Sequence, residues 1–312
     1  MANTLRLVTY RGSRGDRLGA LVGASVVDLV DAAAKAATEI PAGMLELIEA
    51  GDEALATARS MLADEPVAAA NAVPLDSVTL LSPIPRPRKN VFCVGRNYAE
   101  HIAESARARG EAAEIPEHVM FFTKPPTAVI GDGAAIEHDA AVSDRLDYEV
   151  ELVLVIGRGG RDIPIESALS HVWGYTVGND VSARDLQSAH GQWFKGKALD
   201  TTCPLGPCIV PAADLPDPHD LAITLTVNGE MRQDARTSMM IFDIPRILHE
   251  LSAGLTLEPG DLVMTGTPSG IGSRMSPPHW LRPGDEIVAE IEGIGVLHNH
   301  VAERIESTRI TA

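Results

Sequence analysis

Cysteine is scarce, because the 312-residue chain contains only Cys93, Cys203 and Cys208. Their odd number excludes a fully paired disulfide framework, and their spacing does not form the paired motif of a structural zinc site. We therefore expect a protein of a reducing compartment, with the cytoplasm as its location.

Positive charge and long apolar runs are scarce as well. Lys and Arg number 26 against 43 Asp and Glu, which gives a formal net charge of -17 at pH 7. Such a surface repels nucleic-acid phosphates and an anionic membrane, and no basic stripe reverses it locally. No uncharged stretch reaches the length that crosses a bilayer, and the N-terminal arginines precede no apolar core of an export signal. The sequence predicts neither a nucleic-acid nor a membrane partner.

The remaining composition is that of a globular protein, with 45% hydrophobic, 22% charged and only 4% aromatic residues. The length suits a large domain with a smaller companion. Three prolines in close succession, Pro83, Pro85 and Pro87, indicate a linker. We expect a small N-terminal α+β domain at residues 1–82 and a larger domain at residues 90–306.

Period-two apolar runs predict an α+β fold that is mainly β. The pair Asn228-Gly229 predicts a type I′ hairpin, because both residues tolerate a positive φ. Asp243 is an expected helix N-cap, with Pro245 in the first turn. The expected strands cover residues 5–10, 18–30, 91–94, 148–156, 172–177, 223–227, 262–265 and 286–291, and the expected helices cover 44–62, 99–109 and 244–251.

Two glutamates mark the start of one predicted strand. Alternation places Glu149 and Glu151 on the same face of a strand whose later residues are apolar on both faces. Taken alone, the pair is equally typical of a solvent-facing strand end. A third carboxylate, Asp180, follows the next strand, and three buried carboxylates would need a cation to offset their cost. Oxygen ligands suit Mg²⁺ best, with Mn²⁺ and Ca²⁺ as alternatives.

Four ordered blocks, at residues 148–152, 174–185, 195–207 and 265–270, resemble the signature motifs of the fumarylacetoacetate hydrolase family. The resemblance extends from about residue 91 to residue 301. It implies a mixed β-roll behind a small N-terminal unit, often as a homodimer. It also implies a Mg²⁺ ion held by Glu149, Glu151 and Asp180.

The resemblance assigns roles to further side chains. His101 and Glu104 are three residues apart on a predicted helix, where a carboxylate can orient an imidazole as a base, although a lone helical histidine is more often a surface residue. Arg184, Gln187 and Lys197 match positions that stabilise negative charge on the substrate. For Arg184 a structural ion pair with Asp185 or another acid is the alternative. Two more expected substrate contacts are Thr267, in a turn whose N–H groups can bind a carboxylate, and Lys124, which alternatively is solvated.

These features indicate a metal-dependent enzyme for a small 2-oxo acid. The leading hypothesis is C–C hydrolysis of an acylpyruvate such as fumarylpyruvate, with a metal-stabilised enolate as leaving group. The alternatives are an isomerase, tautomerase or decarboxylase acting on a hydroxymuconate, a heptadienedioate or an oxaloacetate-type acid, because family membership does not select among them. Residues 273–280 resemble those of members that act on dicarboxylic substrates. A different class of function is an inactive metal-dependent binding protein.

Overall fold

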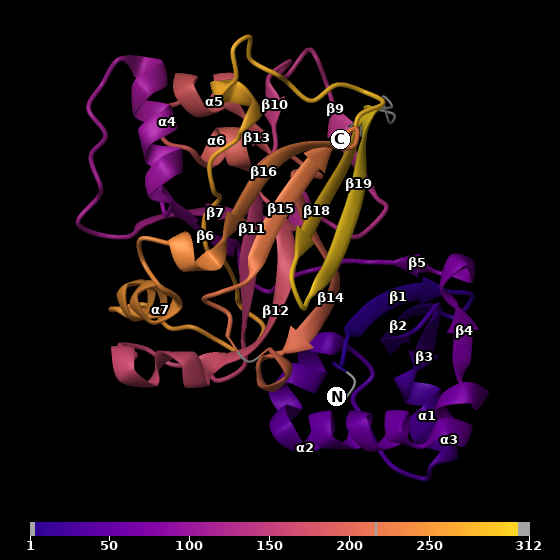
Figure 1. The fold of residues 1–312 in the computed structure, drawn as a ribbon. Helices are drawn as coiled ribbons and strands as arrows, with labels where there is room; N and C mark the ends of the chain where they lie inside the picture. Colours follow the sequence, from indigo (N-terminus) through magenta and orange to yellow (C-terminus); the bar gives the residue numbers. More distant parts are fainter. Residues whose placement is uncertain (1–3, 216, 305–312) are drawn as a thin grey trace, which may run out of the picture.

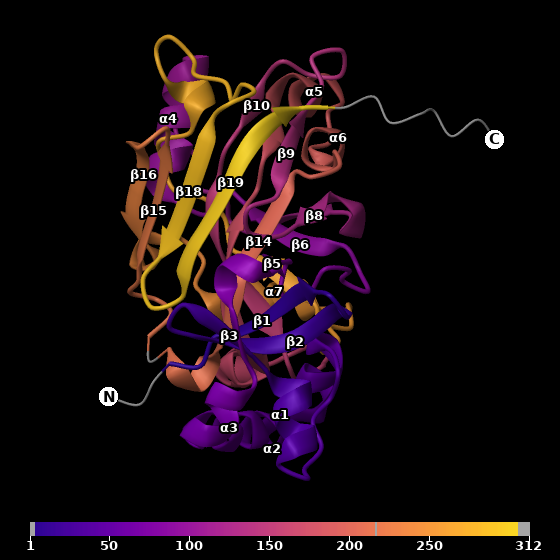
Figure 2. The same cartoon turned by 90° about the vertical axis from the view of Figure 1, so that its right-hand side faces the viewer.

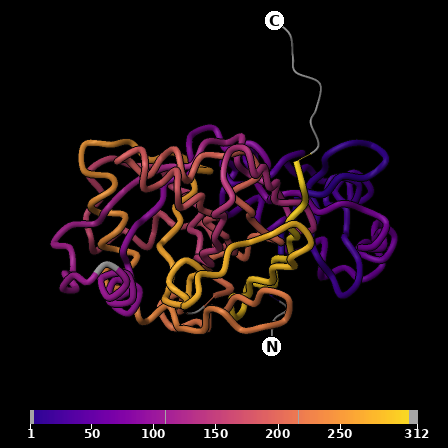
Figure 3. The backbone as a smooth tube through the Cα atoms, turned by 90° about the horizontal axis from the view of Figure 1, so that it is seen from above, coloured from indigo at the N-terminus to yellow at the C-terminus, as the bar shows by residue number. Residues whose placement is uncertain are grey.

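The computed structural model describes residues 4–215 and 217–304. The fold is mixed and mainly β, as predicted, and Figure 3 shows an elongated molecule with its N-terminal unit at one end. Residues 1–3 of the first predicted domain, and 305–306 of the second, lie outside the described residues. Within the described ranges, no helix is both long and apolar enough to cross a membrane.

The N-terminal unit is a small sheet covered by helices (Figures 1 and 2). Its strands are β1 (Leu7–Gly12), β2 (Gly15–Val22), β3 (Ser25–Asp28) and β4 (Ala72–Pro74), and its helices are α1 (Leu29–Lys35), α2 (Met44–Ala63) and α3 (Glu65–Ala70). The predicted single strand at 18–30 is wrong, because the chain turns at Gly23, with φ of 57°, and forms the two paired strands β2 and β3. The second of them ends at Asp28, which caps α1 by accepting a hydrogen bond from the Asp31 amide. The sheet is continuous with the large one, since Leu7 of β1 pairs with Ile209.

The large sheet carries the most buried strands of the chain. From β1 it continues through β14 (Cys203–Pro211), β12 (Val172–Asn179), β11 (Val150–Ile156), β17 (Leu262–Met264), β6 (Val91–Gly95) and β7 (Met120–Lys124), with the short β5 (Thr79–Leu80) beside β1 and β8 (Val129–Ile130) beside β14. Every residue of β11 is buried, which confirms the prediction that this strand is covered on both faces.

A second sheet packs on one face of the first. Its order is β16 (Glu230–Arg236), β15 (Ala222–Val227), β18 (Glu286–Ile291), β19 (Gly295–Glu303) and β9 (Ala135–His138). Leu152 and Leu154 of β11 belong to the same core as Ile223, Leu225 and Ile287 of this sheet. The predicted hairpin is confirmed, because Asn228 and Gly229 have φ of 53° and 77° between β15 and β16.

Short helices gather at the end of the molecule away from the N-terminal unit (Figure 1). They are α4 (Ala99–Arg109), α5 (Arg184–Ala189) and α6 (Phe194–Lys197), beside the strand pair β10 (Leu146–Asp147) and β13 (Ser182–Ala183). The predicted helix 99–109 coincides with α4. The prediction for α7 (Ile244–Ser252) is confirmed as well, with the Asp243 carboxylate accepting from the Arg246 amide. The 3₁₀ turns are η1 (Leu75–Ser77), η2 (Pro126–Ala128), η3 (Ile165–His171), η4 (Ala212–Asp214), η5 (Thr237–Met239) and η6 (Gly272–Arg274).

Asn97, between β6 and α4, is a fully buried tie between three segments. Its amide donates to the carbonyl oxygens of Phe242 and Thr265 at 3.0 and 2.8 Å and accepts from the Phe242 N–H at 2.7 Å. Asn97→Ala leaves these backbone groups unpaired, so we expect a loss of about 3 kcal/mol in unfolding free energy by urea titration. Asn90→Ala is the control, because the half-buried Asn90 side chain has one hydrogen bond within the described residues, donated to Thr123 at 3.1 Å. Equal losses in the two variants would contradict the assignment.

Candidate metal and active site

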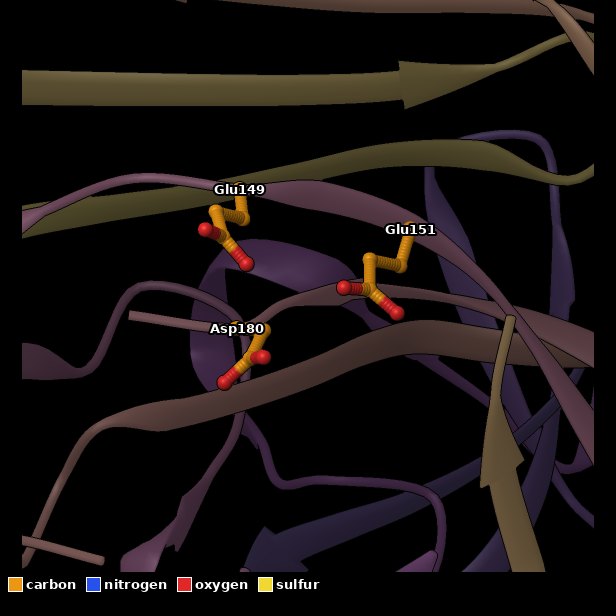
Figure 4. A group of neighbouring side chains, drawn as sticks. All are labelled: Glu149, Glu151 and Asp180. Carbon is orange, nitrogen blue, oxygen red and sulfur yellow. The ribbon is translucent and has the colours of Figure 1, made fainter. Parts of the chain in front are cut away.

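The pairing of β11 with β12 brings the three predicted metal ligands together. Val150 pairs with Asn179, and the Asp180 amide donates to the Glu149 carbonyl at 2.8 Å, so the end of one strand meets the start of the other. Glu149, Glu151 and Asp180 are 5%, 1% and 0% exposed, and each offers a carboxylate oxygen within 4.8 Å of the others (Figure 4). The solvent-facing alternative for the two glutamates is therefore wrong.

Two of the three carboxylates already have cationic partners. The Lys197 ammonium lies 2.7 Å from Glu149 Oε2 and 2.6 Å from Asp180 Oδ2, and Lys124 lies 2.7 Å from Asp180 Oδ1. The Arg184 guanidinium lies 2.6 Å from Glu149 Oε1. Burial opposes the ionised form of Glu149, but Lys197 and Arg184 outweigh it and lower its pKa.

Glu151 differs from its neighbours, because its hydrogen-bond donor in the described part of the chain is a backbone group, the Gly266 N–H at 2.7 Å. Burial, together with the charges of Asp180 and Glu149, raises the pKa of Glu151 well above its ordinary value. A buried carboxylate in this position needs either a proton or a cation. The three residues therefore fit a hard divalent cation with oxygen ligands, as predicted from the sequence.

The predicted His101–Glu104 pair forms on the inner face of α4. The ring Nδ1 lies 3.0 Å from Glu104 Oε1, and the two side chains are 13% and 14% exposed. Glu104 also accepts from the Gly270 N–H at 3.1 Å, so its carboxylate is held from two sides. Because Glu104 occupies Nδ1, and Nε2 has no hydrogen-bond partner among the described residues, Nε2 is the ring nitrogen that can exchange a proton.

A cavity of about 340 Å³ lies between α4, α5, α6 and the carboxylates. Its lining includes seven of the ten residues predicted for the site: His101, Glu149, Glu151, Arg184, Gln187, Lys197 and Thr267. Phe122 and Trp193 form part of its wall, with their rings edge to face and centroids 5.5 Å apart. The cavity thus combines charged groups with an apolar wall, as small-ligand sites commonly do.

Two expectations about this cavity need correction. Lys124 does not line it: the side chain is fully buried and its ammonium donates to Asp180 and to the Val181 carbonyl at 3.0 Å, so neither a solvated lysine nor a direct substrate contact describes it. The turn at 265–270 does not present all its N–H groups to a substrate, because those of Gly266 and Gly270 donate to Glu151 and Glu104. The Lys124 ammonium and these two N–H groups therefore donate hydrogen bonds to acidic side chains of the protein.

Two buried polar residues of the site were absent from the sequence prediction. Asp147 accepts from Arg184 Nε at 2.8 Å, and Gln233 donates to Thr267 Oγ1 at 2.8 Å while accepting from the Val150 amide at 3.0 Å. The alternation that selected Glu149 and Glu151 also places Asp147 on their face, so that signal was present. Nothing local marks Gln233, whose partners are distant in the sequence.

Comparisons with known proteins agree on the family. Residues 90–302 match the family model described as "Fumarylacetoacetate (FAA) hydrolase C-terminal". Oxaloacetate tautomerase YisK of Bacillus subtilis is 46% identical over 266 residues, which cover 84% of this chain and 87% of that protein.

Two solved structures are similar over nearly the whole chain. The fumarylacetoacetate hydrolase of Exiguobacterium antarcticum has 40% identity and a TM-score of 0.81, covering 96% of this chain and 100% of that one. The 2-hydroxyhepta-2,4-diene-1,7-dioate isomerase of Mycobacterium marinum has 32% identity and a TM-score of 0.73, covering 96% and 99%. The chain belongs to the fumarylacetoacetate hydrolase family.

Proposed function

We propose that the protein is a divalent-metal-dependent tautomerase that interconverts the keto and enol forms of a small 2-oxo dicarboxylic acid, with oxaloacetate as the first compound to test. The observation that carries the proposal is the imidazole–carboxylate pair His101–Glu104, which lies at the same cavity as the buried acidic cluster. The relatives named as an oxaloacetate tautomerase and a dienedioate isomerase support this chemistry over the hydrolysis that the motifs first suggest.

Glu149, Glu151 and Asp180 would hold the cation, for which Mg²⁺ is the first candidate. Such an ion supplies Lewis-acid stabilisation to the negative charge of an enolate. The protein's own part is to move a proton between the carbon next to the oxo group and the oxo oxygen. His101 Nε2 takes the proton as the C–H bond breaks, and the same proton then forms the enol O–H bond. Glu104 holds the ring in the tautomer that leaves Nε2 free.

The cations at the cavity stabilise the intermediate charge. Lys197 and Arg184 both line the cavity and are fixed by the carboxylates that they contact. Because these contacts exist before a substrate enters, little reorganisation is needed when negative charge develops on the oxo oxygen. The side-chain amide oxygen of Gln187 accepts a hydrogen bond from Arg184 Nη1 at 3.2 Å and so limits the rotation of that guanidinium.

The test is an assay of the enol–keto interconversion of oxaloacetate in the presence of Mg²⁺, in which ultraviolet absorbance monitors the reaction. We expect His101→Asn to lower kcat by about 10²–10⁴-fold, because it removes the base, and to leave the Mg²⁺ affinity intact. His298→Asn is the matched control, since His298 is 58% exposed and absent from the cavity lining. A wild-type rate in His101→Asn would refute the assigned base.

C–C hydrolysis of an acylpyruvate is the second candidate, supported by the similarity to the fumarylacetoacetate hydrolase structure. In that reaction the His101–Glu104 pair would activate a water molecule instead of removing a carbon-bound proton. Incubation with acylpyruvates and with oxaloacetate, and analysis of the products by mass, distinguishes hydrolysis and decarboxylation from tautomerisation. A binding protein would show thermal stabilisation by ligand and Mg²⁺ without turnover.

A further inference from the structure

Asp147 is a fully buried carboxylate that accepts hydrogen bonds from three separate parts of the chain. It lies in β10, two residues before Glu149. Its Oδ1 accepts from the backbone N–H groups of Tyr148 and Gly272 at 3.0 and 2.8 Å, and its Oδ2 accepts from Arg184 Nε at 2.8 Å and the Ser273 N–H at 3.0 Å. One side chain therefore contacts both a cavity arginine and a loop 125 residues further along the chain.

The first consequence concerns the orientation of Arg184. Its Nε faces Asp147 and its Nη2 faces Glu149, so two carboxylates hold the planar guanidinium along two edges. Burial opposes its charge, but Glu149 and Asp147 outweigh this effect and raise the pKa of Arg184. Of the two carboxylates, Glu149 belongs to the acidic cluster, whereas Asp147 is absent from the cavity lining. Asp147 thus holds the arginine from a position outside both the acidic cluster and the cavity lining.

The second consequence concerns the loop that includes η6. The N–H groups of Gly272 and Ser273 are anchored on Asp147, and only glycine fits at 272, because a Cβ there would lie 2.0 Å from the His279 carbonyl oxygen. The adjoining part of the loop is where α4 docks. Arg274 Nε donates to Ser105 Oγ at 3.2 Å, and the Gly270 N–H donates to Glu104.

We propose that Asp147 is a positioning residue that sets Arg184 and the docking loop of α4 with one carboxylate, so that the charge-stabilising arginine and the His101–Glu104 pair take up their places together. The inference rests on the proposed function of the same cavity. It assigns Asp147 an effect on turnover that neither metal binding nor the folding of β10 by itself would produce.

Asp147→Asn is the informative substitution, because it keeps the shape and changes the donors. With the amide oxygen facing Tyr148 and Gly272, the amide nitrogen would face Arg184 Nε and the Ser273 N–H, which are both donors. Arg184 keeps its contact with Glu149 but loses the hydrogen bond from its Nε to residue 147. We expect kcat/KM to fall by about 10- to 100-fold, as small misplacements of catalytic groups do. The Mg²⁺ dissociation constant should stay within about twofold, because the three ligands are untouched.

The control is Asp185→Asn, the neighbouring acid on α5. Its carboxylate accepts from Ser143 Oγ at 2.6 Å rather than from Arg184, so we expect kcat/KM within about twofold of wild type. The variants are made in the full chain and measured for kcat, KM, Mg²⁺ affinity and the midpoint of urea unfolding. If Asp147→Asn lowers only the unfolding midpoint and leaves kcat/KM unchanged, Asp147 is structural and the proposal fails.

A double-mutant cycle with Arg184→Lys tests the route of the effect. Because Arg184 is one of the two groups that Asp147 is proposed to set, the double variant should lose less activity than the product of the two single losses, whereas fully additive losses would overturn the proposal. Should Asp147→Asn not fold, Asp147→Ser, which removes the opposed amide donor, takes its place in the same cycle.

The proposed function can fail separately. Its failure would appear as a wild-type enzyme without turnover of any acid tested. In that case, the Mg²⁺-dependent affinity for oxalate, a chelating analogue of an enolate, is compared between wild type and Asp147→Asn. An affinity at least about tenfold weaker in the variant supports the positioning role, and an equal affinity overturns it.

Discussion

Glu151→Gln is expected to abolish Mg²⁺-dependent activity, with kcat lower by about 10³-fold or more. The Lewis-acid contribution of a catalytic cation is several kcal/mol, and each 1.36 kcal/mol is about tenfold in rate. Glu151 is the member of the cluster whose hydrogen-bond donor among the described residues is a backbone group, and that donor, the Gly266 N–H, can also donate to the amide oxygen of glutamine. The substitution therefore removes the charge with little change in shape. Isothermal titration with Mg²⁺ and the oxaloacetate assay measure the two losses.

The same variant should be more stable than wild type at pH 7 when Mg²⁺ is removed. Because burial and two neighbouring acids raise the pKa of Glu151, the folded protein holds a proton there that the unfolded chain releases above its ordinary pKa. The stability that this group contributes is therefore fully present below the unfolded pKa and is lost as the pH rises from the unfolded pKa to the raised folded pKa, and glutamine escapes this loss. The gain should vanish in more acidic solution, where Glu151 is protonated in both states. Urea titrations at several pH values, with chelator present, measure it.

Glu149→Gln is the matched comparison, because it removes a metal ligand that has cationic partners. Lys197 and Arg184 both contact Glu149, and breaking a buried ion pair costs about 3–5 kcal/mol. We expect this variant to lose Mg²⁺ binding as Glu151→Gln does, but to be less stable than wild type without the metal. If both variants bind Mg²⁺ normally, the three carboxylates are not the metal site.

Local patterns in the sequence predicted those parts of the fold that depend on local physics. Turn chemistry placed the Asn228-Gly229 hairpin, the cap at Asp243 placed α7, and alternation placed Glu149, just before β11, on the same side of the chain as Glu151 in β11. The predicted strand 148–156 begins two residues early, because Tyr148 and Glu149 precede the first pairing of Val150 with Asn179. The strand end is where the site forms.

Strand β14 was not among the predicted strands, although it lies between β1 and β12. It contains Pro204, Pro207 and Pro211, and proline removes a hydrogen-bond donor from a sheet. The structure accommodates Pro207 at an irregularity, where the register with β12 shifts between Tyr175 and Val177. A sequence pattern cannot indicate such a shift, because it depends on which residue of a distant strand lies opposite.

Partners far apart in the sequence account for the errors at the site. Lys124 reads as a strand-end lysine, and only the folded chain brings it to Asp180, 56 residues later. The glycine-rich turn at 265–270 reads as an anion-binding loop, but two of its N–H groups serve Glu151 and Glu104. In both cases the residue type indicated a polar group near the site, but the sequence did not show which distant residue that group contacts. The acidic cluster was easier to predict, because Glu149 and Glu151 are two residues apart in the sequence, at the start of one strand.

Lys197→Met is expected to separate turnover from metal binding. The Lys197 side chain is 2% exposed, and its ammonium contacts both Glu149 and Asp180. Burial works against its charge, but Asp180 and Glu149 outweigh this effect and hold the pKa of Lys197 above its ordinary value. Loss of this cation should lower kcat by about 10²–10³-fold, as the loss of one preorganised charge-stabilising group does. Two metal ligands also lose a competing partner, so Mg²⁺ affinity should be equal to or higher than that of wild type.

Lys195→Met provides the control, since Lys195 is exposed on the same short helix and should keep wild-type kcat and Mg²⁺ affinity. The comparison with Glu151→Gln makes the prediction specific: one variant loses the metal and the rate, and the other loses the rate alone. Weaker Mg²⁺ binding in Lys197→Met would mean that the lysine holds the carboxylates in place for the ion. An unchanged kcat would mean that the charge of Lys197 balances the buried acids and takes no part in the reaction.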